Sequence, residues 1–469
     1  MTELSLLDSP FAARYGSDEM RTIWSDAHRR GLWRRVWVAL AEAQARAGVV
    51  GEAQVADLRA QAGQPNTARA LEIEREIGHD VMAEVRAFAE QCPVGGGIIH
   101  FGATSADITD NADVLRQREA LRLLRARLAD LLGALAAQID AYSALAGMAY
   151  THLQPAEPTT LGYRLAVYAQ DLLEHLSAID RLLGELRGKG LKGAVGTAAS
   201  YTELLAGLPT TPAELEANFL AALELPAFTI ATQTYPRIQD YVLLSVLAAL
   251  AGSLHKFAFD VRLLQSQGMG ELAEPFGAKQ VGSSAMPFKR NPVNAEKICS
   301  LCRFVAGLPA VAWSNAAESL LERTLDDSAN RRAILPEGFL ASEEALIAAA
   351  RIVTGLVVDE AAIAANLERY GPFAATERVL MALVRAGADR QKIHERLREH
   401  SLKAWTAVKA GRPNPLGGSI AADPEMLRYL QPARLRELME ARAYVGTAVE
   451  RARALAQRIR TTLERLPPG

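Results

Sequence analysis

One uninterrupted apolar seam near the middle of the chain sets the strongest constraint on its fold. From Asp240 to Gln265, apolar side chains recur at alternating steps of four and three residues: Leu243, Leu247, Leu250, Leu254, Phe257, Val261 and Leu264. This heptad spacing predicts a helix, and because no proline lies between Pro236 and Pro275 the helix can exceed about 40 Å in length. Polar residues interrupt the apolar character of the segment: Asp240, Ser253, His255, Lys256, Asp260 and Arg262. They exclude a bilayer span and predict a helix buried in a soluble bundle.

Two more periodic stretches favour an all-α fold. Between Ile108 and Leu145 apolar residues follow steps of three and four, and a third such stretch runs from Thr160 to Leu186. Alternating β-branched runs bounded by turns, which indicate strands, hardly occur. Since the seams of several long helices exceed what one short bundle can cover, we expect helices of other subunits to cover the remainder in an obligate oligomer.

Changes along the chain predict three regions. Glycines from Gly95 to Gly102 indicate the end of an N-terminal helical domain, residues 1–105. The long-helix pattern then fills a central bundle domain, residues 106–357, and near Val357 it gives way to shorter helices of a C-terminal domain, residues 358–469. We expect the last helix of that domain to run from about Pro432 to Leu463.

The charge balance and the cysteines exclude several kinds of partner. With 52 basic and 54 acidic residues the chain is almost neutral, so neither a nucleic-acid nor a membrane partner is predicted. The first thirty residues carry acidic side chains and no unbroken apolar run, and we therefore expect no secretory signal and a cytoplasmic location. Cys299 and Cys302 have the spacing of half a zinc site, but no second pair completes it, so no metal or other cofactor is predicted. Both cysteines, and Cys92, are expected to be reduced.

A segment that follows the apolar seam contains residues suited to substrate binding. Residues 282–292 read Gly-Ser-Ser-Ala-Met-Pro-Phe-Lys-Arg-Asn-Pro, a composition that predicts a loop. Gly282 would let the backbone approach a ligand. Lys289 supplies a cation and Asn291 an amide donor, a combination suited to a substrate carboxylate. From composition alone, such a segment is more often an ordinary turn.

This loop resembles the signature GSSxMPxKxNP of the superfamily of fumarases, aspartases and adenylosuccinate lyases. Two further segments resemble the family in the same order along the chain, residues 100–107 (HFGATSAD) and residues 151–160 (THLQPAEPTT). The densest likeness, residues 322–332 (ERTLDDSANRR), is to the animal-type adenylosuccinate lyases. The resemblance implies a three-region, all-α fold whose central bundle assembles into a homotetramer with active sites shared between subunits.

The resemblance also implies a β-elimination that releases fumarate from a succinylated amine. Such a reaction needs a base, fixed positive charge for the doubly charged carbanion, and an acid for the departing nitrogen. By resemblance Ser283 is the base, on a loop that must close over the substrate, and Lys289 stabilises the carboxylate. His152 is the acid and is paired with Glu296, while His79 supports proton transfer.

The expected substrates are nucleotides of purine biosynthesis. The family acts on adenylosuccinate, giving AMP, and on the succinylated aminoimidazole carboxamide ribotide. By resemblance the phosphate is bound by Arg14, Tyr15, Arg323, Ser328 and Arg332. The rest of the substrate is contacted by Asp80, Thr104, Ser105, Thr151, Gln233, Asn291 and Leu325. The chain departs from the family at Gly78 and Lys297, which replace arginines, and at Leu320-Leu321, which replaces an aromatic pair.

Two alternatives stay open at this stage. A related lyase could release fumarate from a succinyl-amine that is not a nucleotide, although the phosphate-binding set speaks against it. A non-catalytic helical scaffold would explain the long seams alone, but not the presence of Ser283, His152, Lys289 and Glu296 together. Turnover of the two nucleotides separates these hypotheses.

Overall fold

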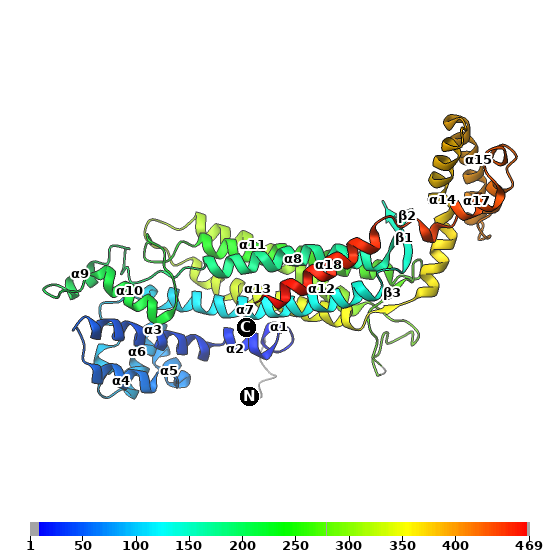
Figure 1. The fold of residues 1–469 in the computed structure, drawn as a ribbon. Coiled ribbons are helices and arrows are strands. Elements are labelled where there is room, and N and C mark those ends of the chain that lie inside the picture. Colours follow the sequence, from blue (N-terminus) through cyan, green and yellow to red (C-terminus); the bar gives the residue numbers. More distant parts are fainter. Residues whose placement is uncertain (1–8, 278, 467–469) are drawn as a thin grey trace.

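Long helices lying side by side form the body of the molecule (Figure 1). The computed structural model describes residues 9–277 and 279–466. Six helices build the bundle: α7 (Ser105–Ala141), α8 (Leu161–Glu185), α11 (Ile238–Leu264), α12 (Val293–Ala317), α13 (Asp327–Thr354) and α18 (Ala448–Glu464). The three stretches with apolar periodicity are α7, α8 and α11, and the all-α prediction is confirmed.

The predicted seam of α11 lies inside this bundle. All seven of its apolar residues, from Leu243 to Leu264, are buried against α8, α12 and α13. Each such side chain contributes about 1.5–3 kcal/mol relative to an exposed one. By length and composition alone α11 could cross a membrane, but the core helix of a soluble protein meets the same criteria.

Helices from the first part of the chain lie along one side of the bundle, from its middle to one of its ends. They are α1 (Pro10–Ala13), α2 (Asp18–Trp24), α3 (Asp26–Arg46), α4 (Glu52–Gln61), α5 (Thr67–Ile77) and α6 (Asp80–Gln91), and two later helices, α9 (Ala199–Leu204) and α10 (Pro212–Leu223), lie at the same end. Trp33 and Trp37 of α3 are buried in the same continuous core as the bundle. The boundary at residue 105 therefore stays a prediction.

Four helices at the opposite end enclose a core of their own. They are α14 (Glu360–Arg385), α15 (Arg390–Lys409), α16 (Leu416–Ala421) and α17 (Pro432–Leu438). The prediction of one helix from Pro432 to Leu463 is wrong, because α17 ends at Leu438 and Gly446 adopts a left-handed backbone (φ 52°) before α18 begins. The chain then returns to the bundle, where α18 packs on α7 and α8. The boundary at residue 357 also stays a prediction.

Two small antiparallel sheets join these helices. Strands β1 (Ala146–Thr151) and β2 (Gln154–Thr160) form a hairpin, and β3 (Leu272–Ala273) pairs with β4 (Val357–Val358). The hairpin is not recognisable from the sequence because its strands contain Gly147, Pro155 and Pro158, and glycine and proline are depleted in strands. Figure 1 shows the hairpin and β3 near the α14 end of the bundle, opposite the N-terminal helices.

Candidate active site

A cavity of about 890 Å³ lies where the N-terminal helices meet the bundle. This volume is within the range of small-molecule sites, about 300 to 1,000 Å³. Predicted site residues from four separate segments line it: His79, Asp80, Thr104, Ser105, Gln233, Arg323, Leu325, Ser328 and Arg332. The structure therefore brings most of the predicted substrate-binding residues together in one chain.

Three helices begin at this cavity. His79 is the N-cap of α6 and Thr104 the N-cap of α7, while Ser328 lies in the first turn of α13. A helix N-terminus presents unpaired N–H groups and about half a unit of positive charge. Together with the guanidinium groups of Arg323 and Arg332, these three ends make the cavity suitable for an anionic ligand.

The turn before α6 explains one departure from the family pattern. Gly78 caps α5 with a left-handed backbone (φ 66°), which glycine adopts at no steric cost. A side chain at this position would meet no other atom within 4 Å, so it is the backbone conformation that favours glycine. The His79 ring directly follows and accepts a hydrogen bond from the Met82 backbone N–H at its Nδ1 atom (3.3 Å).

An ion pair joins two residues that line the cavity. Arg332 Nη2 of α13 donates to Asp80 Oδ2 of α6 at 2.9 Å, and 58% of the Arg332 side chain is exposed. Such an exposed pair contributes at most about 1 kcal/mol. Both residues are predicted to bind substrate, and a substrate anion can displace this contact at little cost.

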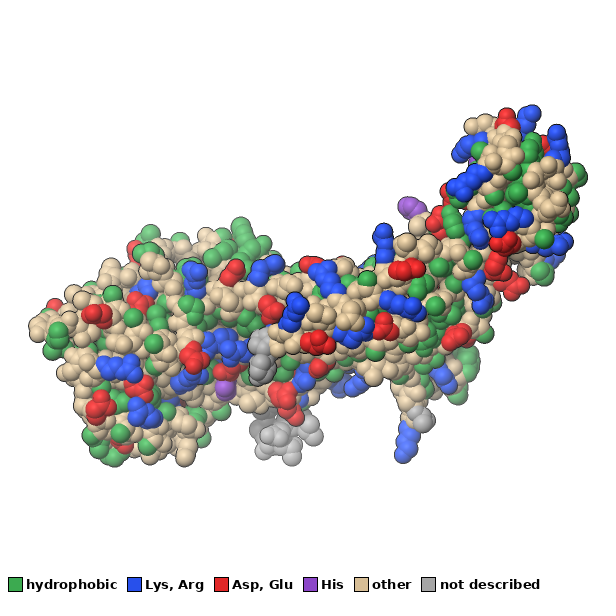
Figure 2. Space-filling model, in the orientation of Figure 1, with side chains coloured by type: hydrophobic (Ala, Val, Ile, Leu, Met, Phe, Trp, Pro, Cys, Tyr) green, Lys and Arg blue, Asp and Glu red, His purple; other side chains and the backbone are tan. Residues whose placement is uncertain are grey.

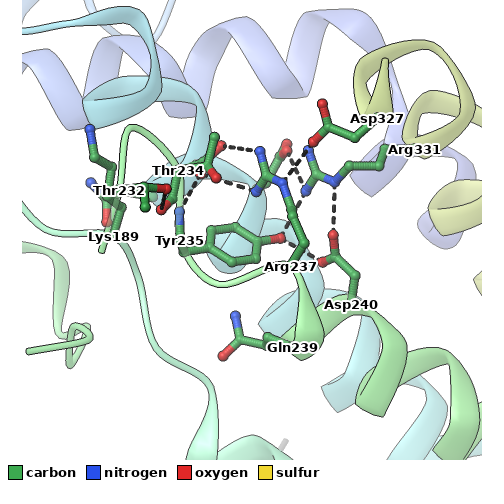
Figure 3. A network of polar contacts seen from close by, with 12 residues as sticks. Lys189, Thr232, Thr234, Tyr235, Arg237, Gln239, Asp240, Asp327 and Arg331 are labelled. Atoms are coloured by element: carbon green, nitrogen blue, oxygen red, sulfur yellow. Dashed lines mark hydrogen bonds and ion pairs between the residues drawn. The ribbon is translucent and has the colours of Figure 1, made fainter. Parts of the chain in front are cut away.

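A buried network of ion pairs forms part of the cavity wall (Figure 3). Arg237 donates from Nε to Asp327 Oδ2 (2.8 Å) and from its two Nη atoms to the Asp110 carboxylate (3.1 and 3.2 Å). Arg331 donates from Nε to Asp240 Oδ2 (2.8 Å). The network thus ties α7, the start of α11 and the start of α13 to one another, and each of these segments borders the cavity.

Tyr235 lies at the centre of the same network. Its hydroxyl donates to Asp240 Oδ1 (2.6 Å) and accepts from Arg331 Nη2 (2.8 Å). Burial would raise the pKa of Asp240, but Arg331 and Arg237 outweigh it and hold that pKa below its usual 3.8. The charges are therefore retained inside the protein, where loss of one partner would leave an uncompensated charge.

Sequence reasoning missed the polar residues that line this wall. They are Asp110, Asp113, Arg116, Arg237 and Arg331. Burial lowers the pKa of the Arg116 guanidinium to about 10. The signal in the sequence is that polar residues such as Asp110 and Gln117 interrupt the otherwise apolar core face of α7 at helical spacing.

The loop 282–292 lies far from this cavity. Ser283 Oγ accepts a hydrogen bond from the Met286 backbone N–H (3.1 Å), and the Asn291 amide donates to the Gly282 carbonyl (3.0 Å). A Cβ atom on Gly282 would come within 2.1 Å of the Lys289 carbonyl oxygen. In this conformation Gly282 therefore allows close approach of the loop's own backbone rather than of a ligand, which differs from the prediction.

His152 lies on a two-residue turn at the tip of the hairpin, next to Thr151 at the end of β1. His152 and Leu153 both have left-handed backbones (φ 53° and 59°), as a type I′ turn requires. For residues other than glycine this conformation costs about 1–3 kcal/mol each, and such strain concentrates at functional sites. The predicted partner Glu296 lies in the first turn of α12, with half of its side chain exposed.

The lengths of α7 and α11 give the distances from the cavity to the hairpin and to the loop 282–292. The cavity borders α7 from Ser105 to Arg116, and the remaining residues of that helix, up to Ala141, place the hairpin about 38 Å away. It also borders Arg237, and the 27 residues of α11 place the start of the segment that carries the loop about 40 Å away. Within one chain, Ser283, His152, Lys289, Asn291 and Glu296 therefore do not meet the cavity residues.

Arg14 and Tyr15 also lie outside the cavity. Ser17, two residues further, donates from Oγ to Glu343 Oε1 of α13 at 2.8 Å. Glu343 lies fifteen residues beyond Ser328, about 22 Å along the helix. These two predicted phosphate ligands are thus separated from Arg323, Ser328 and Arg332 in the same chain.

Comparisons with known proteins match nearly the whole chain. The family model described as "Lyase" matches residues 13–307, and the one described as "Adenylosuccinate lyase C-terminus" matches residues 372–455. The chain is 37% identical over 457 residues to the adenylosuccinate lyase of Schistosoma mansoni, covering 96% of this chain and 94% of the relative. It is 36% identical over 458 residues to the adenylosuccinate lyase of Saccharomyces cerevisiae, with coverage of 96% and 94%.

A solved structure agrees with these relatives. The fumarate lyase from Mesorhizobium sp. BNC1 superposes with a TM-score of 0.83 at 26% identity, covering 96% of this chain and 99% of that one. The fold, the sequence identity to the two relatives and the match of the C-terminal family model all indicate the same family. The chain belongs to the adenylosuccinate lyase family of the lyase superfamily.

Proposed function

We propose that this chain eliminates fumarate from adenylosuccinate, giving AMP, and from the succinylated aminoimidazole carboxamide ribotide, in purine biosynthesis. Its family makes it a carbon–nitrogen lyase. The observation that carries the proposal is the cavity, where three helix N-termini and the guanidinium groups of Arg323 and Arg332 meet. A nucleotide with a phosphate and two carboxylates matches this concentration of positive charge and N–H donors.

The proposed reaction assigns one proton transfer to each of two residues. Ser283 removes a proton from the carbon next to a succinyl carboxylate, and the electron pair delocalises into that carboxylate. Lys289 and Asn291 stabilise the resulting double negative charge. The carbon–nitrogen bond then breaks, the electron pair of the carbanion forms the double bond of fumarate, and His152 protonates the departing amine.

Several copies of the chain are needed to build such a site. The distances of about 40 Å from the cavity to the loop segment and to the hairpin of the same chain exceed any side-chain reach. We therefore infer a homotetramer in which the loop with Ser283, the hairpin with His152 and the cavity come from different copies. Arg14 and Tyr15 would reach the phosphate from another copy in the same way.

Exposed apolar side chains support this assembly. Near the predicted site segments they include Leu153, Val281, Phe288, Leu321 and Leu325, and on α11 they include Ile238, Val242, Phe259 and Leu263. Exposed apolar side chains that cluster in this way are typical of surfaces that partner subunits cover. On the face shown in Figure 2, acidic and basic side chains are intermingled, so no large field of one sign opposes association of copies. A cytoplasmic location stays a prediction.

The direct test is turnover of each nucleotide by the purified protein. We expect loss of substrate absorbance and release of fumarate from both nucleotides. Ser283→Ala should lower kcat by at least about a hundredfold, the scale of general base catalysis. Ser284→Ala, next to it in the same exposed loop, is the matched control and should retain activity. Full activity in Ser283→Ala would overturn the proposed mechanism, and absence of turnover of both nucleotides would favour a lyase for another succinyl-amine.

A further inference from the structure

One carboxylate joins the buried network to the cavity. Asp327 is 3% exposed, and its two oxygens have different partners. Oδ2 accepts from Arg237 Nε at 2.8 Å, and Oδ1 accepts from Arg323 Nη1 at 2.9 Å. Both arginines border the cavity, but Arg237 is buried and Arg323 is partly exposed, so Asp327 links a buried arginine to a more accessible arginine of the site.

The interior half of this bridge is rigidly held. Arg237 uses its remaining two Nη atoms on the Asp110 carboxylate of α7, and Asp110 Oδ2 also accepts from the Tyr235 backbone N–H (2.8 Å). Figure 3 shows Arg237, directly before α11, close to Asp327 and Arg331, which both lie at the start of α13. Because every member is buried and hydrogen-bonded, Asp327 has little freedom to rotate.

The Arg323 guanidinium, in contrast, keeps donors available. Among the residues that the structure describes, the side chain of Arg323 makes one hydrogen bond, from Nη1 to Asp327. Its Nε and Nη2 groups therefore remain for a ligand in the cavity. A guanidinium that is held at one edge loses less conformational freedom when it binds an anion with the other edge.

We propose that Asp327 is a positioning residue that holds Arg323 in the orientation in which it binds the substrate phosphate. The inference rests on the function proposed above, in which Arg323 is a phosphate ligand. Asp327 lies between two cations, Arg237 and Arg323, so its carboxylate does not face the phosphate as an unpaired negative charge. Asp327 itself does not contact the substrate.

The test uses a variant that moves the carboxylate but keeps its charge. Asp327→Glu displaces the oxygens by one methylene, and the dissociation constants of AMP and adenosine are then measured by calorimetry. We expect AMP to bind roughly tenfold more weakly while adenosine binds as before, because only AMP has the phosphate. In turnover, KM for adenylosuccinate should rise by a similar factor with kcat nearly unchanged.

Two controls separate positioning from general damage to the site. Asp326→Glu makes the same change at the neighbouring residue, which is exposed and makes no side-chain cap to α13, and it should leave both affinities unchanged. In an Arg323→Gln background, Asp327→Glu should have no further effect on AMP. Equal weakening of AMP and adenosine, or persistence of the effect in that background, would overturn the proposal.

A second variant covers the case in which Asp327→Glu does not fold. Asp327→Asn removes the charge and replaces one of the two acceptor oxygens with an NH2 group, so the side chain can no longer accept from both Arg237 and Arg323, and positioning predicts weaker AMP binding. Tighter AMP binding would mean that Asp327 acts only as a repelling charge, which would overturn the proposal. Failure of the proposed function would give a different result. The unchanged protein would then turn over neither nucleotide, while Asp327→Glu would still lose affinity for AMP but not for adenosine.

Discussion

The loop with Ser283 and the hairpin with His152 lie far from the cavity of their own chain. Two inactive variants should therefore restore activity when they are combined in one oligomer. Ser283→Ala lacks the proposed base. His152→Asn lacks the proposed acid, and asparagine tolerates the left-handed turn on which His152 lies. Since α7 and α11 each place these residues about 40 Å from the cavity of their own chain, a site must combine copies.

Random assembly sets the size of the expected recovery. In an equal mixture, a site is intact only when Ser283 comes from a His152→Asn copy and His152 comes from a Ser283→Ala copy. Each choice has a probability of one half, so about a quarter of the sites should be active. The two variants are coexpressed with different affinity tags, oligomers that carry both tags are purified, and fumarate release is compared with the unchanged protein.

The control mixture pairs Ser283→Ala with the double variant Ser283→Ala/His152→Asn, which lacks any intact Ser283 and should stay inactive. Recovery near a quarter would support sites shared between copies. If oligomers that contain both single variants remain inactive, Ser283 and His152 act from the same copy or do not act together, and the inference that the loop and the hairpin of one site come from different copies is refuted.

The buried network and the histidines provide two further tests. Arg331→Met should lower the free energy of unfolding by about 3–5 kcal/mol, measured by urea denaturation, because it leaves the buried Asp240 without its closest cation. Arg332→Met, next to it but exposed, should change stability by less than about 1 kcal/mol, and equal effects would contradict the argument. Burial lowers the pKa of His100, whose Nδ1 accepts a hydrogen bond from Trp37, so below pH 6.5 the unfolded chain takes up a proton that the folded protein resists. Stability should therefore fall as pH drops below 6.5, and His100→Gln should reduce that slope; an unchanged slope would show that His100 is not its source.

Much of the fold could be predicted from apolar periodicity. The seams of α7, α8 and α11 are visible because burial on one face of a long helix imposes spacings of three and four. The hairpin could not be predicted in this way, because Gly147, Pro155 and Pro158 lack strand propensity and the pairing depends on tertiary contacts. The break between α17 and α18 depends on the left-handed backbone of Gly446, and a glycine alone does not fix that conformation.

The candidate site, like the fold, could be predicted from the sequence only in part. Family motifs identify Arg323, Ser328 and Arg332, and the structure places them in one cavity. Asp110 and Arg237 escaped prediction because single charged residues on helices are usually solvated, and their pairing joins segments more than a hundred residues apart. The position of Ser283 relative to the cavity depends on assembly between copies, which residue patterns within one chain do not encode.

The long helices also restrict how a chain of this kind can change in length. Inserting a single helical turn into α7 would move the hairpin by about 5.4 Å relative to the cavity, more than the span of a hydrogen bond. The same insertion in α11 would shift the loop 282–292 while leaving the hairpin in place, so two parts of one assembled site would fall out of register. Insertions and deletions should therefore be tolerated in the connections around α9 and α10 and in those between α15, α16 and α17, but not within the bundle helices.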